Sequence, residues 1–376
     1  MSDNIDRASS TRRVAIIHYW LVGMRGGEKV LESLCRMFPQ ADIFTHVCDR
    51  ARLSETIARH RIVETRIGSL PFARSQYQKY LPLMPRALEE IDLSGYDLVI
   101  SSESGPAKGV IPPPDAPHLC YCHSPMRYLW DQYHVYRNGA GGLTKAMMPR
   151  LAHGLRQWDV TSAARVDGFV ANSTFVSKRI RKYWRRDSDV VHPPVAIEDF
   201  APCPKSDLGD YYLWAGELAP YKRPDLLVDA FRELDLPLLI IGGPDSAVRK
   251  LQRHAGRRTR FLGKTSFDQL RHHMARCKAL VFPGEEDFGI VPVEVMASGR
   301  PVIAYGRGGV LDTVVPGETG IFFDRQDIAA LVDAIRCFED SALSDADSAA
   351  CVTRAGRFTE RAFQEGIRRT LKRIGA

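Results

Sequence analysis

A chain of 376 residues is longer than a single hydrophobic core usually spans, so its length predicts two domains. Hydrophobic residues make up 44% of it, yet no apolar run approaches the 18 residues of a membrane span, which favours a globular protein. The net charge is +7, and residues 1–200 carry most of it, with 27 Lys and Arg against 21 Asp and Glu. Because these basic residues are diffuse and no helix-turn-helix, zinc-finger or RNP-like pattern accompanies them, we expect no nucleic-acid partner. An anionic membrane surface or a pyrophosphate-bearing acceptor fits the charge as well.

The start of the chain, residues 1–13, is polar, and no apolar segment follows it. We therefore expect a flexible arm rather than a signal peptide, and a protein that stays in the cytoplasm. The eight cysteines are scattered and mostly lie inside apolar segments, which is typical of reduced thiols. Cys120 and Cys122 lie beside His123, but no second pair completes a zinc set, so we expect no metal site.

Residues 14–18 are an apolar run that predicts a buried strand. Gly23, Gly26 and Gly27 follow in a flexible turn, and residues 28–38 have apolar side chains at helical spacing. The spacing of these glycines differs from the G-x-G-x-x-G fingerprint of dinucleotide-binding folds. This strand, turn and helix therefore do not predict a dinucleotide site.

Residues 69–92 mix aromatic, basic and apolar side chains around three prolines. Two interpretations remain open: a surface segment packed on its own domain, or an edge that faces an acceptor or a membrane. The second rests on Arg74, Lys79 and Arg86, which interleave with aromatic residues.

Residues 96–101 and 118–122 are two more short apolar strands. Strands that alternate with helical segments predict a parallel, doubly wound sheet, in which ligands bind beyond the carboxyl ends of the strands. His123 comes directly after the strand 118–122, and Arg127 follows it. A lone histidine is more often structural than catalytic, but this one lies where the rule places ligands.

Residues 168–171 predict a strand, after which Asn172 or Ser173 caps a helix with a basic last turn at 178–182. We interpret this basic turn as a solvated helix face. Residues 192–205 are proline-rich and irregular, which is typical of a hinge between domains.

The second half repeats the alternation of strands and helices. Residues 211–214 predict a strand and 225–234 a helix, with an irregular loop between them. A further strand at 260–263 leads into another helical segment through Lys264.

Residues 278–283 predict a buried strand that ends at a Pro-Gly turn, and 290–298 predict a helix closed by Gly299. The turn carries three acids, Glu285, Glu286 and Asp287. A helix start offers unpaired N–H groups and the positive end of the helix dipole, so it suits a phosphate, and Gly289 allows close approach. Acids at a helix start are also ordinary capping residues. Glu286 and Glu294 are eight positions apart, so two carboxylates flank this candidate anion site.

The order of strand, acidic turn, helix, Gly-Arg-Pro and strand over 277–306 resembles the donor-site signature of retaining GT-B glycosyltransferases of family 4. The segment HSPMRYLWDQY at 123–133 is similar to a branch that includes bacterial mannosyltransferases of surface-polysaccharide assembly. The resemblance implies an α/β protein of the GT-B class, with two Rossmann-like doubly wound domains facing across a cleft. The implied parts are an arm (1–13), an acceptor-side domain (14–195), a nucleotide-sugar-binding domain (196–355) and a helix crossing back to the first domain (356–376).

The resemblance also implies roles for single residues. His123 would lie at the donor sugar near the reacting carbon, Glu286 would hold the sugar, and Lys222 would grip the donor pyrophosphate. Glu294 would hold the nucleotide ribose. Glu217 stands where the family has an arginine, so Arg223 would compensate. The remaining implied contacts are Gly26 and Gly27 closing over the donor, Lys264 at the base, the turn residues Phe288, Gly289 and Ile290 at the phosphates, and Arg127 on the acceptor side.

The implied reaction moves a hexosyl unit from a nucleotide sugar to a hydroxyl with retention, without metal or cofactor. Mannose from GDP-mannose, transferred to a lipid-linked oligosaccharide at the inner face of the plasma membrane, is the specific expectation. A UDP- or dTDP-sugar donor remains open. So do a GT-B epimerase, a phosphorylase and a non-enzymatic sugar-nucleotide sensor.

Overall fold

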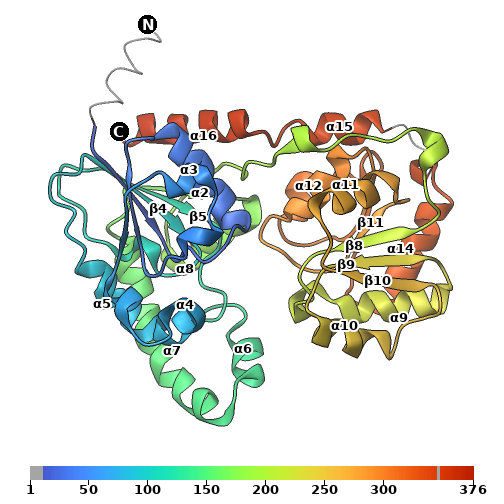
Figure 1. Cartoon of the computed structure of the whole chain (residues 1–376), viewed down its shortest axis with the longest axis horizontal. Coiled ribbons are helices and arrows are strands. Elements are labelled where there is room, and N and C mark those ends of the chain that lie inside the picture. Colours follow the sequence, from blue (N-terminus) through green and yellow to red (C-terminus); the bar gives the residue numbers. More distant parts are fainter. Residues whose placement is uncertain (1–11, 345–347) are drawn as a thin grey trace, which may run out of the picture. The chain divides into compact units, whose positions relative to one another are not determined.

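The computed structural model describes residues 12–344 and 348–376, so most of the predicted arm lies outside the described residues. The chain divides into two compact units (Figure 1). Unit 1 comprises Met1–Pro194 together with Phe363–Ala376, and unit 2 comprises Val195–Ala362. The division falls inside the proline-rich segment 192–205. No described helix has both the length and the apolar character needed to cross a membrane.

Unit 1 is built on a seven-stranded sheet in the order β3-β2-β1-β4-β5-β6-β7, and every registered pair is parallel. Its central strands are buried over their whole length, as short continuous apolar runs should be when helices cover both faces. The strands are β1 (Val14–His18), β2 (Asp42–Thr45), β3 (Ile62–Glu64), β4 (Leu98–Glu103), β5 (His118–Cys122), β6 (Gly168–Ala171) and β7 (Asp189–Val190).

Helices on both faces of this sheet close the core of unit 1 (Figure 1). Ser173 caps α8 by accepting a hydrogen bond from Val176 N at 3.1 Å, as its place before the helix predicts. The helices are α2 (Gly26–Met37), α3 (Glu55–Ala58), α4 (Ala73–Gln76), α5 (Met84–Glu89), α6 (Tyr133–Gly139), α7 (Gly142–Ala163), α8 (Thr174–Trp184) and α16 (Glu360–Arg373).

The final helix begins later than its amphipathic pattern predicts. The pattern predicts a helix from about 356, but α16 begins at Glu360, where Thr359 Oγ1 accepts a hydrogen bond from Ala362 N at 3.2 Å. Phe363 and Ile367 lie one turn apart on this helix and pack into the core of unit 1. Because of this burial, residues Phe363–Ala376 belong to unit 1.

Unit 2 has a six-stranded parallel sheet in the order β10-β9-β8-β11-β12-β13. The strands are β8 (Tyr212–Ala215), β9 (Leu238–Ile241), β10 (Thr259–Gly263), β11 (Leu280–Phe282), β12 (Val302–Tyr305) and β13 (Gly320–Phe323). Two apolar clusters, one on each face, join the sheet to its helices. The helices are α9 (Pro224–Leu234), α10 (Asp245–Gln252), α11 (Phe267–Arg276), α12 (Ile290–Ala297), α13 (Val310–Thr313), α14 (Ile328–Glu339) and α15 (Ala349–Ala355).

Both sheets are doubly wound, which confirms the predicted α/β class of two Rossmann-like domains. In each sheet the first strand lies beside the fourth, so the strand order reverses between β1 and β4 in unit 1 and between β8 and β11 in unit 2. Ligands of such sheets bind beyond the carboxyl ends of the strands at this reversal. The two places to search are therefore the residues after β1 and β4, and those after β8 and β11.

Two local predictions were wrong. Gly26 and Gly27 are not in a flexible turn but begin helix α2, and a Cβ on Gly27 would lie 2.4 Å from the Tyr19 hydroxyl oxygen. A side chain at position 27 would therefore require Tyr19 to move. The strand expected at 96–101 is Leu98–Glu103 instead, because Tyr96 is held in a turn by its N–H bond to Leu93 O and its hydroxyl bond to Asp42.

Candidate functional site

In unit 2, the loops after β8 and β11 meet at an ion pair. Lys222, at the end of the short 3-10 helix Pro220–Lys222, lies with its Nζ 2.7 Å from Glu286 Oε1. Burial alone lowers the pKa of Lys222, but the charge of Glu286 and its hydrogen bond raise it above its usual value. A Cβ on Gly284 would lie 2.7 Å from Lys222 Cα, so only glycine lets the two loops approach this closely. The structure therefore holds a charged lysine at the strand reversal.

The N-terminus of α12 lies next to this pair in the chain. Gly289 is its N-cap with a φ of 83°, a left-handed conformation that favours glycine. Ile290 is the first helical residue, and the first-turn N–H groups of a helix have no partner inside the helix. Glu294 is half-buried in the second turn of the same helix. The strand is shorter than the predicted 278–283, because β11 spans only Leu280–Phe282. The helix begins at Ile290 as predicted, with Glu286 on the turn before it and Glu294 within it.

Residues 307–309 contact the acidic turn and fix its backbone. Gly309 N donates to Glu286 O at 2.8 Å, and a Cβ on Gly308 would lie 2.5 Å from that carbonyl oxygen. Arg307 Nε pairs with Glu285 Oε2 at 2.9 Å. The glycines here are thus required by close contact with the chain's own backbone. Of the acids in the turn, Glu285 is engaged by Arg307 and Glu286 by Lys222.

Other predicted donor residues of unit 2 are placed differently. The Phe288 side chain is buried in the core, where its ring centroid lies 5.7 Å from that of Phe358, so only its backbone is available to a ligand. The Arg223 guanidinium binds Asp225 at 2.9 Å and the carbonyl of Gln326 at 3.3 Å. To replace the arginine that the family has at position 217, Arg223 would have to leave these two partners. Lys264 is exposed directly after β10.

In unit 1, His123 follows β5 and its backbone is fixed on both sides. Its N–H donates to Glu103 O at 2.7 Å, and its carbonyl accepts from Asn172 Nδ2 at 2.9 Å. The ring Nε2 lies 2.8 Å from Ser102 Oγ on β4, at the strand reversal. Arg127 lies four residues on, in the turn before Trp130, whose N–H donates to the carbonyl of Arg127. His123 thus follows the strand next to β4, and its ring reaches the strand reversal, where the topology rule expects a ligand, through Ser102.

Sequence reasoning missed the partners behind His123. Ser102 Oγ also lies 3.0 Å from Nδ1 of His18, and His18 Nε2 lies 3.9 Å from Glu28 Oε1 on α2. The available signal was that His18 ends the first predicted strand, and the carboxyl ends of parallel strands meet at one edge. The predicted end of the strand 96–101 left Ser102 outside it.

A buried charged cluster lies directly beneath this strand end. Lys108 Nζ contacts Asp159 Oδ1 and lies 3.6 Å from Glu103 Oε1, and all three side chains are fully buried. Trp130 and Trp184 donate their indole N–H groups to the other oxygen of Asp159. This cluster was not predicted, since its members lie 51 positions apart in the chain.

The α6–α7 hairpin of unit 1 carries an exposed apolar stripe, and Figure 1 shows both helices extending beyond the sheet of that unit. Leu143, Met147 and Leu151 lie four residues apart on α7 and are 78%, 50% and 38% exposed. Residues 132–158 contain four Lys and Arg and no acid. Leu81, from the segment 69–92, packs against the same hairpin. An exposed apolar stripe with only basic charge around it is typical of a surface that meets an anionic interface.

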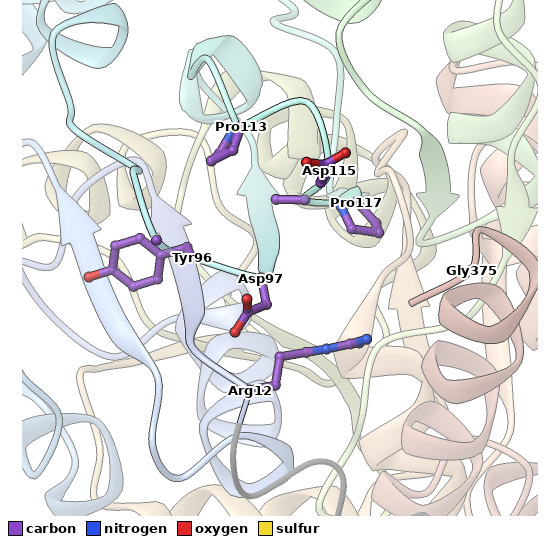
Figure 2. Close-up of a pocket in the computed structure, with 9 residues that line it drawn as sticks. Arg12, Tyr96, Asp97, Pro113, Asp115, Pro117 and Gly375 are labelled. Carbon is purple, nitrogen blue, oxygen red and sulfur yellow. The ribbon is translucent and has the colours of Figure 1, made fainter.

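One cavity of about 530 Å³ opens in unit 1, at a different edge of the sheet (Figure 2). Asp97 and Pro117, which line it, directly precede β4 and β5. It therefore lies at the amino ends of these strands, whereas His123 follows the carboxyl end of β5. We do not assign it to the site.

The described cysteines are all free thiols, and six of the eight are buried. Within residues 12–344 and 348–376, no three His, Cys, Asp or Glu side chains gather as metal ligands would.

Comparisons with known proteins agree with the fold. The model of glycosyltransferase family 4 matches residues 24–199, and that of glycosyl transferases group 1 matches residues 198–356. By family, the chain is a GT-B glycosyltransferase. The two matches overlap at residues 198 and 199, inside the predicted hinge.

Relatives of this glycosyltransferase include the D-inositol 3-phosphate glycosyltransferase of Streptomyces coelicolor, 30% identical over 222 residues. That alignment spans 47% of this chain and 49% of the relative, so the chain matches about half of it. Among solved structures, Anabaena HepE in complex with UDP and glucose superposes with a TM-score of 0.69 at 17% identity, over 95% of this chain and 99% of that one. Sucrose-phosphate synthase from Thermosynechococcus elongatus gives 0.70 at 19% identity, over 96% and 99%. At these identities the superpositions support the fold alone.

Proposed function

We propose that the protein transfers a hexosyl unit from a nucleotide sugar to an acceptor hydroxyl, with retention at the anomeric carbon. The observation that carries the proposal is the Lys222–Glu286 pair beside the N-terminus of α12. In such a transfer the leaving group is a nucleoside diphosphate, and its growing negative charge must be stabilised. A lysine kept charged by Glu286 and the first-turn N–H groups of α12 are groups of the required kind.

The proposed roles follow the family resemblance. Lys222 binds the departing pyrophosphate, Glu286 contacts the donor sugar and keeps Lys222 charged, and Glu294 binds the ribose. His123 acts at the sugar near the reacting carbon, and Arg127 on the acceptor side. The acceptor hydroxyl attacks the anomeric carbon from the same face from which the leaving group departs. The departing phosphate takes the proton of the acceptor hydroxyl.

The proposed donor is GDP-mannose, by the similarity of residues 123–133 to bacterial mannosyltransferases of surface-polysaccharide assembly. The solved relative with UDP makes a UDP-sugar the main alternative. Thermal shift with GDP, UDP, dTDP and CDP on the full chain tests both. We expect GDP to raise the melting temperature most, since a ligand that binds only the folded state stabilises it. The largest shift with UDP would replace mannose by a UDP-sugar, and no shift with any of the four would contradict the proposed function.

Activity is expected to persist in EDTA. Lys222 and the α12 N-terminus supply positive charge where metal-dependent transferases use a divalent ion. Transfer should be measured with the donor selected above, with and without chelator. A loss of turnover in EDTA that manganese restores would contradict the metal-free mechanism.

We further propose that the acceptor is a lipid-linked oligosaccharide and that the protein docks on an anionic membrane. The support is the α6–α7 stripe, with its exposed leucines and methionine and its surrounding basic residues. Apolar side chains insert at the headgroup boundary, and each nearby Lys or Arg adds about 1 kcal/mol on an anionic surface.

Binding to anionic liposomes is expected to exceed binding to neutral ones at low salt and to fall as salt rises. In sedimentation, the double variant Leu143→Ser, Met147→Ser should recover much less protein with anionic liposomes. Leu311→Ser is the matched control, because Leu311 is 52% exposed on α13 of unit 2. Equal recovery with neutral liposomes, or equal losses in both variants, would contradict a docking surface on α7.

A further inference from the structure

A line of polar side chains connects His123 with the interior of unit 1. Its members are Ser102, His18 and Glu28. The distances are 2.8 Å from His123 Nε2 to Ser102 Oγ and 3.0 Å from Ser102 Oγ to His18 Nδ1. His18 Nε2 then lies 3.9 Å from Glu28 Oε1, which is too long for a hydrogen bond but within the range of an ion contact. His18, Ser102 and Glu28 are all buried, so water does not compete for these contacts.

The sheet itself brings these residues together. β1 and β4 pair in parallel with His18 directly opposite Ser102, and β4 pairs with β5 so that Glu103 is opposite Cys122, the residue before His123. α2 then supplies Glu28 from its first turn, where Glu28 Oε2 accepts the N–H of Arg25 at 3.0 Å. The line is therefore a consequence of register at the strand reversal rather than of chance side-chain positions.

The chemistry of this line links the proton of one histidine to that of the other. A serine hydroxyl has a single proton, so Ser102 donates to one ring and accepts from the other. If His18 carries its proton on Nε2, toward Glu28, its Nδ1 must accept from Ser102. The Ser102 oxygen then accepts from Nε2–H of His123, and the neutral His123 ring keeps an unprotonated Nδ1.

The charges around His18 favour this direction. Burial raises the pKa of Glu28, but the adjacent His18 ring and the N–H groups of Glu28 and Arg25 have a larger, opposite effect. The pKa of Glu28 is therefore below its usual value, and Glu28 is an anion facing Nε2 of His18. Tyr19, whose ring centroid lies 4.2 Å from that of His18, has a pKa raised by burial and stays neutral. Glu103 follows Ser102 on β4, and burial raises its pKa to about 7 although the charge of Lys108 lowers it.

We propose that Ser102, His18 and Glu28 are positioning residues that hold the His123 ring and fix its tautomer, with the proton on Nε2 and an acceptor nitrogen at Nδ1. The inference rests on the proposed function for its catalytic meaning, since His123 acts there at the donor sugar. An unprotonated Nδ1 accepts a hydrogen bond from a sugar hydroxyl and cannot donate one to it. The tautomer therefore selects the hydrogen-bonding pattern that the site presents.

The test combines ring nitrogen spectroscopy with kinetics. Long-range ¹H–¹⁵N spectra of histidine-labelled full-length protein distinguish the two tautomers, and loss of one signal set in His123→Gln assigns His123. We expect a pure Nε2–H pattern in the unchanged protein and a mixture in Ser102→Ala. Turnover should fall roughly 10- to 100-fold in Ser102→Ala with little change in donor KM, the range found for partners that orient metal-ligating histidines.

The chain supplies a matched control on the same strand. Ser101 is as buried as Ser102, and its Oγ lies 2.9 Å from His118 Nε2. Ser101→Ala thus removes an equivalent buried bond to another histidine and should leave the His123 signals unchanged. Glu28→Gln keeps an oxygen for the Arg25 N–H while removing the charge, and it should shift the His123 tautomers as Ser102→Ala does. Glu32→Gln on the same helix should not.

Three results would overturn the proposal: unchanged His123 signals in Ser102→Ala, an equal change in Ser101→Ala, or an Nδ1–H pattern in the unchanged protein. The spectroscopic arm needs no substrate, so failure of the proposed function is separable. If the tautomer responds as expected but no nucleotide sugar is turned over, the positioning line stands and the transferase assignment falls.

Discussion

Replacing Lys108 by methionine is expected to lower the free energy of unfolding of unit 1 by about 3–5 kcal/mol. Lys108 lies fully buried between Asp159 and Glu103, and its Nζ forms an ion pair with each of the two carboxylates. Without it, two acids would remain in an apolar core. Removing one member of a buried ion pair costs far more than the pair itself contributes, because the partner is left without compensation.

The loss should depend on pH. Burial already raises the pKa of Glu103 to about 7, against a usual value of 4.5. The folded protein therefore holds a proton that the unfolded chain releases between these values, so the contribution of Glu103 to stability falls as pH rises through this window. Lys108 lowers the pKa of Glu103, so Lys108→Met should widen the window upward. The variant should consequently be closest to the unchanged protein at low pH.

Urea unfolding followed by tryptophan fluorescence suits this test, because four of the five tryptophans lie in unit 1. Lys29→Met is the control, since Lys29 pairs with Glu32 at 3.4 Å on the surface, where such pairs contribute about 1 kcal/mol or less. The double variant Lys108→Met, Asp159→Asn should recover part of the loss. A loss below about 1 kcal/mol in Lys108→Met would contradict a requirement for the buried cation.

The second large effect concerns the two glutamates of unit 2, which we assign to different parts of one donor. Glu286→Ala should reduce kcat strongly, on the order of 100-fold or more, because Glu286 is the proposed contact to the donor sugar, which a free nucleoside diphosphate lacks. Affinity for the free nucleoside diphosphate should stay nearly intact. Glu294→Ala should instead weaken nucleotide binding by roughly 1.5–3 kcal/mol, the usual contribution of a hydrogen bond to a charged group.

Calorimetry with the nucleoside diphosphate, alongside turnover, separates the two roles. Glu285→Ala is the matched control from the same turn, because Glu285 pairs with Arg307 instead of Lys222. It should change kcat and affinity little. Loss of nucleotide binding in Glu286→Ala with normal binding in Glu294→Ala would invert the assignment and the proposed donor orientation.

Much of the architecture was predictable from local patterns. The strands at 14–18, 118–122 and 168–171 have the predicted bounds, because each is a continuous buried run. The sequence by itself also determined the junction of β11 and α12 and the position of Glu286 and Glu294 on it. Strand periodicity, proline and glycine act over a few residues, so short windows carry this information.

Contacts between distant segments were decided only by the tertiary structure. Gly26 and Gly27 lie in helix α2, where position 27 packs against Tyr19, and the Phe288 ring faces the core. Strand register places His18 against Ser102, which is 84 positions away in the chain. No local pattern encodes which parallel strands become neighbours, because pairing depends on the packing of the whole sheet. The residues that carry chemistry were therefore visible in the sequence, whereas the partners that orient and charge them were set by the fold.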